Sequence, residues 1–247
     1  MGDETIKWAI NEDDSVVYAP LTKQLLPQAI ELMHGYFYTQ ETICKAFHVA
    51  NQPECFPELD ILLRKAAVDG VSIVALDKTS GAVIGATFNK LEEKTDSDFY
   101  QEYPKTLKYP ASRKVAMWIA DTEKLFDIFD HCNVSSLFEI MFLGVVPSFR
   151  NRGIAKKLIQ VSIDIARQLK AGNNVLVPVN DQDLNLEHPP QIVTGIFTSS
   201  ATQKIAKDLN FEIGSKIYFD KYVYDGQSLG DLVGQEIPYF TYEYLRL

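Results

Sequence analysis

A short basic segment, residues 150–157, holds the residue types best suited to chemistry. Its cations are Arg150, Arg152, Lys156 and Lys157. An apolar run precedes the segment and a helical pattern follows it, which places its backbone N–H groups at a helix N-terminus, where phosphate groups bind. Gly153 has no Cβ and lets the backbone approach an anion closely. We therefore predict that this turn holds a phosphate or pyrophosphate group.

The alternative for this segment is an ordinary basic loop that caps a helix. Two other phosphate-binding patterns are excluded, because the chain contains neither the Gly-x-Gly-x-x-Gly of dinucleotide folds nor a P-loop. The chain carries 24 Lys and Arg against 33 Asp and Glu, a net charge of −9. This charge disfavours nucleic acid and anionic membranes as partners and suits a cationic small molecule.

Length and composition predict one domain over residues 1–247, because 46% of the residues are hydrophobic. The cysteines, Cys44, Cys55 and Cys132, are odd in number and lack metal-ligand spacing. We therefore expect no metal site and no disulfide framework, as in a reducing compartment. No apolar run approaches the roughly 20 residues that span a bilayer. These features favour a cytoplasmic protein with no membrane partner. The oligomeric state is left open, with a monomer favoured.

Strand and helix patterns alternate along the chain, which indicates an α/β or α+β fold. Strands are predicted at 15–19, 71–76, 82–91, 137–146, 175–179, 212–224 and 238–245. Helices are predicted at 25–37, 56–68, 113–131, 154–169 and 198–209, with an irregular excursion at 92–112. The two strands at 137–146 and 175–179 would flank a helix in a βαβ unit, and the C-terminal strands would close the sheet.

The segment Arg150 to Ala155 resembles the Arg/Gln-x-x-Gly-x-Gly/Ala signature of the GNAT acetyltransferase superfamily. Phe142 to Pro147 stands in the place of that family's strand, and Leu209 to Phe211 looks like its Leu-Gly-Phe. Within GNAT the chain is most similar to the insect arylalkylamine N-acetyltransferases. Four segments carry this closer resemblance: 37–41, 85–89, 145–158 and 195–199. The resemblance implies a mixed, largely antiparallel central sheet flanked by helices.

The resemblance also implies acetyl-CoA as the cosubstrate, held by the βαβ unit. Backbone amides from Arg150 to Lys156 would hold its pyrophosphate, and the strand Met141 to Val145 would pair with its pantetheine arm. An amide of that strand could donate to the thioester oxygen as charge develops there. The expected coenzyme-binding residues are Phe142, Leu143, Gly144, Val145, Arg150, Asn151, Arg152, Gly153, Ile154, Ala155, Lys156 and Ser199.

A protonated amine needs a base before it can attack a thioester. By the resemblance that base is Glu41, which follows Phe37 in a Phe-x-x-x-Glu spacing, with Thr42 where the subfamily usually has Pro. The alternatives for Glu41 are a solvated side chain or a helix cap. Thr198 and Thr202 match the spacing of serines thought to assist proton transfer in the subfamily, although N-capping alone would explain hydroxyls there.

The sequence contains no compelling nucleophile, and the four histidines form no recognisable triad. Direct attack of the amine on acetyl-CoA in a ternary complex is therefore expected rather than an acyl-enzyme route. Two rivals are open, namely a non-catalytic module that binds acetyl-CoA and a transferase for a longer acyl donor or a protein amine.

The expected acceptor is an arylalkylamine such as dopamine, tyramine or serotonin, from the subfamily resemblance. A polyamine or a guanidino-amine such as agmatine is the alternative. The excursion at 92–112 is aromatic and acidic, and it would attract a cationic amine. The same residues could instead form a solvated loop whose aromatic rings pack on the core.

Overall fold

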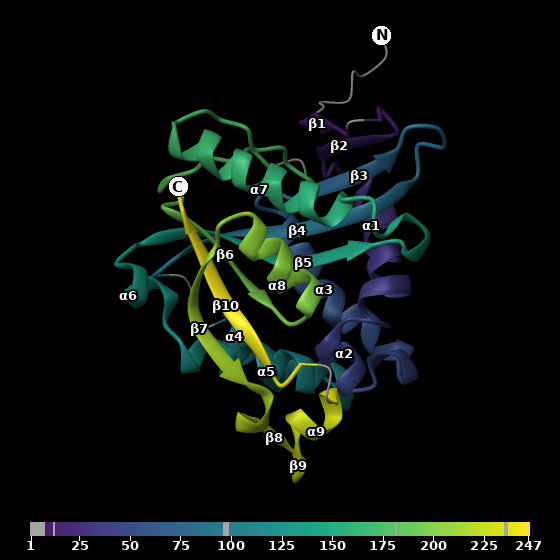
Figure 1. The fold of residues 1–247 in the computed structure, drawn as a ribbon, viewed down its shortest axis with the longest axis vertical. Coiled ribbons are helices and arrows are strands. Elements are labelled where there is room, and N and C mark those ends of the chain that lie inside the picture. Colours follow the sequence, from purple (N-terminus) through teal and green to yellow (C-terminus); the bar gives the residue numbers. More distant parts are fainter. Residues whose placement is uncertain (1–7, 12, 96–98, 181, 235–236) are drawn as a thin grey trace.

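The computed structural model describes residues 8–11, 13–95, 99–180, 182–234 and 237–247. In these residues an eight-stranded sheet has the order β1-β2-β3-β4-β5-β6-β10-β7 (Figure 1). Its strands are β1 (Ala9–Ile10), β2 (Val16–Pro20), β3 (Ile73–Asp77), β4 (Val83–Glu93), β5 (Ser136–Val145), β6 (Ile192–Phe197), β7 (Glu212–Tyr218) and β10 (Tyr239–Arg246). Among the described residues, every neighbouring pair of strands in this sheet is antiparallel except β5 with β6, which is parallel. The expected mixed, largely antiparallel sheet is confirmed.

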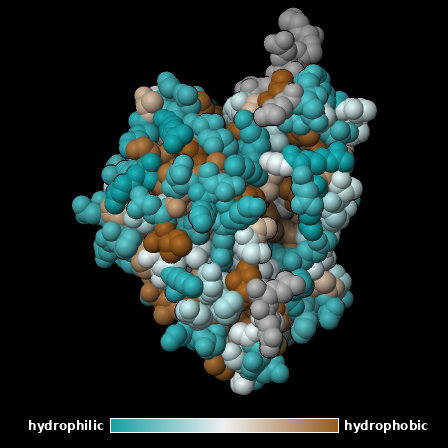
Figure 2. Space-filling view, viewed as in Figure 1, coloured by the Kyte–Doolittle hydropathy of each residue, from teal (hydrophilic) through white to brown (hydrophobic). Residues whose placement is uncertain are grey.

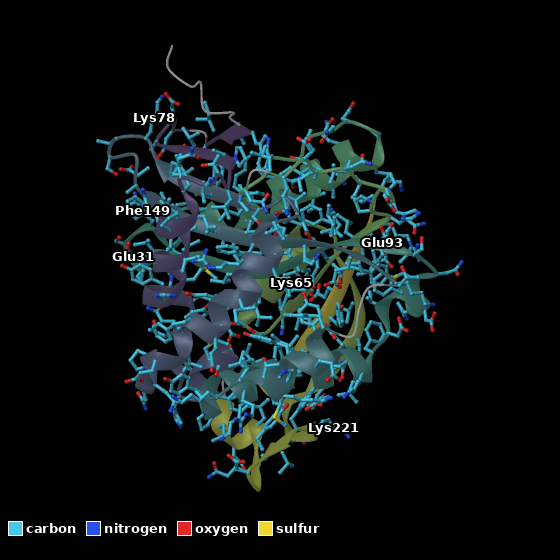
Figure 3. The ribbon with its side chains drawn as sticks, turned by 180° about the vertical axis from the view of Figure 1, so that it is seen from behind. Glu31, Lys65, Lys78, Glu93, Phe149 and Lys221 are labelled. Carbon is cyan, nitrogen blue, oxygen red and sulfur yellow. The ribbon has the colours of Figure 1, made fainter. Side chains whose placement is uncertain are left out.

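Helices cover both faces of this sheet. They are α1 (Leu26–Leu32), α2 (Thr42–Ala46), α3 (Phe56–Ala67), α4 (Phe99–Thr106), α5 (Pro110–Leu125), α6 (Ile128–Cys132), α7 (Ile154–Lys170), α8 (Ser200–Asp208) and α9 (Leu229–Val233). A π-helix, η1 (Met33–Phe37), continues α1. Strands β8 (Val223–Tyr224) and β9 (Gln227–Ser228) pair as a small antiparallel sheet. Figure 1 shows α7 and α8 in front of the sheet, and Figure 3, from behind, shows α3, α4 and α5 over the other face.

The two helical layers bury separate apolar cores against the sheet. The core on the α7 side contains Phe138, Ile140 and Leu158. The core on the opposite side is built from α1, α2, α3 and α5 and contains Met33 and Phe88. Strand β5 contributes to both cores, because alternate side chains of a strand face opposite sides of a sheet. This double burial explains why its sequence is almost wholly apolar.

The βαβ unit is present, but its second strand is not the predicted one. Residues 175–179 form no strand, and β5, α7 and β6 make the parallel crossover instead. In the 175–179 segment Val177 N donates a backbone hydrogen bond to Gly70 O at 2.9 Å, and Pro178 has no N–H to donate. The pattern of β6 was missed in the sequence because Gly195 interrupts its apolar run.

The excursion at 92–112 is not irregular as predicted, because α4 forms within it. Tyr103 of α4 is 5% exposed and donates a hydrogen bond to the Glu58 carbonyl, so its ring packs on the core. The helix expected at 113–131 is two helices. Its first part begins early, at Pro110, because proline suits the first turn of a helix. Asp127 then caps the separate α6 by accepting from Asp130 N, 3.0 Å.

Candidate active site

Strands β5 and β6 separate in the middle of the sheet. They are paired from Leu137–Ile192 to Ile140–Gly195, but β5 continues to Val145 with only β4 beside it in the described residues. Figure 1 shows β5 running across the molecule while β6 turns away beside β10. Met141 is the extra residue of a bulge in β5, since Phe88 faces Phe142 and Asn89 faces Ile140. The strand therefore offers an open backbone edge from Met141 to Val145.

The basic turn follows directly on this open edge. Asn151 and Gly153 both have left-handed backbones, with φ of 60° and 76°, and they turn the chain from β5 into α7. Gly153 is the N-cap of α7, and no side chain caps the helix. Its first amides are therefore open to an outside acceptor. A Cβ built on Gly153 would meet nothing within 4 Å, so space is available there.

The cations of the turn are held in different ways. Arg150 Nε donates to the Val145 carbonyl at 3.2 Å, which ties the turn to the end of β5. The Arg152 guanidinium lies 5.0 Å from the Phe149 ring centre, and Lys156 pairs with Asp208 at 3.3 Å. Figure 2 shows a hollow with apolar residues at its base beside the start of α7. An open strand edge followed by positive charge and free helix amides fits an elongated thioester that ends in phosphates.

The π-helix η1 packs tightly on the open part of β5. The Phe37 and Phe142 rings lie edge to face with centres 5.8 Å apart. A Cβ on Gly144 would lie 3.0 Å from side-chain atoms of Leu32 and Met33, so a larger residue there would require these side chains to shift. The loop after η1 begins where Glu41 N donates to Phe37 O. The close packing places this loop next to the point where β5 and β6 separate.

The structure brings Glu41 and Thr198 into contact, although 157 residues separate them in the chain. Thr198 Oγ1 donates to Glu41 Oε1 at 2.7 Å. The other oxygen, Oε2, accepts from the amides of Ile43 and Cys44 at 2.8 and 2.9 Å, so Glu41 is also the N-cap of α2. Thr42, at the position where proline was expected, donates its hydroxyl to the Thr198 carbonyl at 3.1 Å. These bonds fix the carboxylate at the end of β6.

Ser199 and Thr202 form a capping box at the start of α8. Their hydroxyl oxygens are 2.8 Å apart, and Thr202 N donates to Ser199 Oγ at 3.2 Å. Within the described residues, the Thr202 hydroxyl bonds to Ser199 and not to Glu41. Of the predicted catalytic residues, Glu41 and Thr198 are therefore in direct contact. Thr202 bonds to Ser199, the residue that follows Thr198.

A partly buried network beside η1 had no signal in the sequence. His34 Nε2 lies 2.8 Å from Asp60 Oδ1, and the Tyr38 hydroxyl donates to the same oxygen at 3.0 Å. The three residues come from η1, its C-cap and α3, so only the packing of helices unites them. In the described part of the chain, no group of three or more His, Cys, Asp and Glu residues could hold a metal ion.

The model of the acetyltransferase (GNAT) family matches residues 41–186, more than half of the chain. The chain belongs to the GNAT family. The resemblance found in the sequence is thereby confirmed, and the chain is a GNAT N-acetyltransferase that uses acetyl-CoA, as this family does. None of the helices described has the length and apolar character to cross a membrane.

Solved structures of insect enzymes share this fold over almost their whole length. Arylalkylamine N-acetyltransferase 2 from Aedes aegypti has a TM-score of 0.74 at 20% identity, covering 94% of this chain and 98% of that chain. The putative arylalkylamine N-acetyltransferase 7 from the same mosquito has 0.74 at 18%, covering 99% and 98%. The Drosophila melanogaster polyamine N-acetyltransferase, which forms N-acetylagmatine, has 0.72 at 16%, covering 94% and 100%. No curated protein matches this sequence.

Proposed function

We propose that this GNAT acetyltransferase transfers the acetyl group of acetyl-CoA to a small primary amine, with Glu41 as the general base. The observation that carries the proposal is the Glu41–Thr198 contact of 2.7 Å at the end of β6, beside the open edge of β5. Acetyl-CoA supplies an activated thioester. The chain supplies a base, a donor-rich strand edge and an anion-binding turn within one cleft of the sheet.

The coenzyme would lie along β5 and end at the turn. Backbone groups of Phe142, Leu143, Gly144 and Val145 would hold its extended arm, as an added strand does at an exposed edge. The turn residues Arg150, Asn151, Arg152, Gly153, Ile154, Ala155 and Lys156 would hold its pyrophosphate through amides and positive charge. The Ser199 hydroxyl at the start of α8 would face the thiol end.

Glu41 would take the proton from the incoming ammonium. Its Oε2 is held by the Ile43 and Cys44 amides, so Oε1 with its Thr198 partner is the oxygen placed for exchange. The Thr198 hydroxyl can pass a proton, because it donates and accepts. Thr202 would act as a positioning residue, since its capping box with Ser199 orders the residue next to Thr198.

Direct attack by the amine agrees with the state of the nearest thiol. Cys44 is 2% exposed, and burial, with the nearby Glu41 charge, raises the pKa of its thiol well above the usual value. The thiolate is the nucleophilic form of cysteine, so this side chain is unsuited to carry an acetyl group. The amine is then the only nucleophile that the proposal requires.

Removing the Thr198 hydroxyl tests the proton path. Thr198→Val should lower kcat by about 10²-fold, at the low end of general acid–base effects, because Glu41 Oε1 loses its donor. Thr198→Ser keeps the hydroxyl and should retain most of the activity. Steady-state kinetics with one amine at saturating acetyl-CoA would measure both. If Val and Ser variants match the wild type equally, the hydroxyl has no role in proton transfer.

For the acceptor we propose an arylalkylamine first. The Phe37–Phe142 pair offers an aromatic surface beside the cleft, and aromatic rings pack well on such pairs. The alternative acceptor is a polyamine or a guanidino-amine such as agmatine. Solved neighbours carry the names of both kinds of enzyme, but at their low identity they support only the shared fold.

A panel of amines tests the proposed function. Tyramine, serotonin, dopamine, agmatine and simple alkylamines would each be mixed with acetyl-CoA, and release of the free thiol would be followed. We expect turnover with primary amines and none with acetyl-CoA alone. A burst of thiol without an amine would instead indicate an acyl-enzyme. Tight coenzyme binding with no turnover for any amine would refute the proposal and favour a binding module.

A further inference from the structure

Asn89 lies in β4 opposite the point where β5 and β6 separate. Its backbone is paired with Ile140, the last residue of β5 that also pairs with β6, and Met141 bulges out beside this pair. Asn89 is 0% exposed. Asparagine is depleted in strands, and a buried amide is costly unless it is hydrogen-bonded. Its burial at the start of the open edge is tolerated because of the contacts that its side chain makes.

The Asn89 side chain is hydrogen-bonded through both of its polar atoms. Nδ2 donates to the Val71 carbonyl at 2.9 Å and to Ser162 Oγ at 3.0 Å, and Oδ1 accepts from the Thr87 hydroxyl at 2.9 Å. Ser162 Oγ in turn donates to the Leu158 carbonyl at 3.0 Å. Thr87 and Ser162 are also fully buried. Asn89 thus joins the loop before β3, strand β4 and helix α7 through bonds shielded from water, where hydrogen bonds are strongest.

Helix α7 is held against β4 at a second place near its start. A Cβ on Gly85 would lie 3.2 Å from Ile154 Cγ2 and 3.3 Å from Leu158 Cδ1, so the first turns of α7 pack closely on this strand. Gly85 is paired with Val145, the last residue of the open edge. Ser162 follows Ile154 by eight residues, which is about 12 Å along the helix. Two contacts this far apart fix both the position and the tilt of α7 relative to β4.

Strand β4 also carries the open edge of β5, the other half of the proposed coenzyme site. The open edge is paired with β4 from Gly85 to Phe88, and the α7 amides follow β5 through the basic turn. Figure 1 shows α7 lying along β4, with its start on the side where β5 ends. The spacing between the α7 amides and the open edge is therefore set by how α7 sits on β4. A coenzyme bound by both must match this spacing, because one chain joins its thioester to its pyrophosphate.

We propose that Asn89 and Ser162 are positioning residues for acetyl transfer. Their hydrogen bond sets the distance between the turn proposed to hold the pyrophosphate and the open edge proposed to hold the thioester. This inference rests on the proposed function, because it requires the coenzyme to lie along β5 and to end at the turn. Binding energy from the phosphates is then used to place the acetyl group beside Glu41, although the phosphates are remote from the reaction.

The test compares acetyl-CoA with S-acetyl-pantetheine, a donor that has the same thioester arm but no pyrophosphate. For the wild type we expect a higher kcat/KM with acetyl-CoA, because only this donor reaches the turn. Ser162→Ala should lower the ratio of the two kcat/KM values by about tenfold, within the roughly 10²-fold that a 1 Å misplacement can cost. The value for S-acetyl-pantetheine should stay near that of the wild type, because the open edge and Glu41 are unchanged. Alanine suits a helix interior, so α7 should still form.

Ser72→Ala is the matched control. Ser72 is buried and its Oγ accepts from Asn89 N at 3.1 Å, so both variants remove a buried serine hydroxyl that is bonded to Asn89. Ser72 lies before β3 rather than on α7. Its replacement should lower stability, but the ratio of the two donors should remain that of the wild type. Thermal unfolding of both variants would show how far each is destabilised.

The outcomes separate this inference from the proposed function. An unchanged donor ratio in Ser162→Ala, beside a wild type that favours acetyl-CoA, would overturn the inference while the proposed function stands. An equal fall of the ratio in Ser72→Ala would also overturn it, because the effect would then come from a general loss of packing. A wild type that used both donors equally would refute the coenzyme placement and this inference together.

Binding measurements decide the case in which neither donor is turned over. Calorimetric titration should then show that Ser162→Ala weakens the binding of coenzyme A more than that of pantetheine, because only coenzyme A spans the open edge and the turn. Equal dissociation constants in the variant and the wild type, or an equal weakening of both ligands, would overturn the inference without any turnover.

Discussion

Glu41→Gln is expected to lower kcat at neutral pH by about 10²- to 10⁴-fold, the usual contribution of a general base. Glutamine keeps an oxygen that can accept from the Ile43 and Cys44 amides, and Thr198 can accept from its amide group. The fold should therefore survive while the base is lost. The loss should shrink as the pH approaches about 10, where amines lose their proton unaided. A pH–rate profile with a saturating amine would measure this.

The capping role of Glu41 needs its own control. Glu41→Ala removes both the base and the cap, so it should lower kcat similarly and cost about 1 kcal/mol in the free energy of unfolding. Asp127→Ala removes a comparable cap from α6 and should lower stability by a similar amount without affecting kcat. If Glu41→Gln retained the wild-type rate and pH profile, Glu41 would be a structural cap only.

Gly153→Val is expected to raise the dissociation constant for coenzyme A by about 10- to 100-fold, equal to the loss of one or two hydrogen bonds to a charged group. Gly153 has a φ of 76°, which a β-branched residue adopts at a cost, and an added side chain would enter the open space before the α7 amides. Both effects act on the turn proposed to hold the pyrophosphate. Calorimetric titration with coenzyme A would give the dissociation constant.

Gly172 provides a matched control at the other end of α7. Its φ is 84°, and a Cβ on it would also meet nothing within 4 Å. Gly172→Val should therefore cost a similar free energy of unfolding, about 1–2 kcal/mol, and leave coenzyme binding unchanged. The melting temperatures of both variants would verify that their stabilities match. Equal coenzyme affinity in both would show that the turn does not hold the phosphates.

Local patterns sufficed to predict the segment from β5 to α7. The apolar run, the basic turn with Gly153 and the helical spacing from Ile154 lie within about 30 consecutive residues. The same kind of reasoning placed a false strand at 175–179, where apolar residues occur without a neighbouring strand to pair with. It also overlooked α4, because the polar, proline-containing sequence owes its helix to packing of residues such as Tyr103 on the core.

Contacts between distant segments account for what the sequence left open. Glu41 was singled out by its spacing, but its bond to Thr198 depends on α2 and the end of β6 meeting across the molecule.

The amino-acid sequence by itself thus determined the consecutive strand, turn and helix from β5 to α7 and the family, because elements that are consecutive in the chain are set by short-range sterics and apolar periodicity. The tertiary structure alone decided the partner of the proposed base. This partner depends on how residues 157 positions apart are buried together, and burial is a property of the whole packed sheet rather than of any segment.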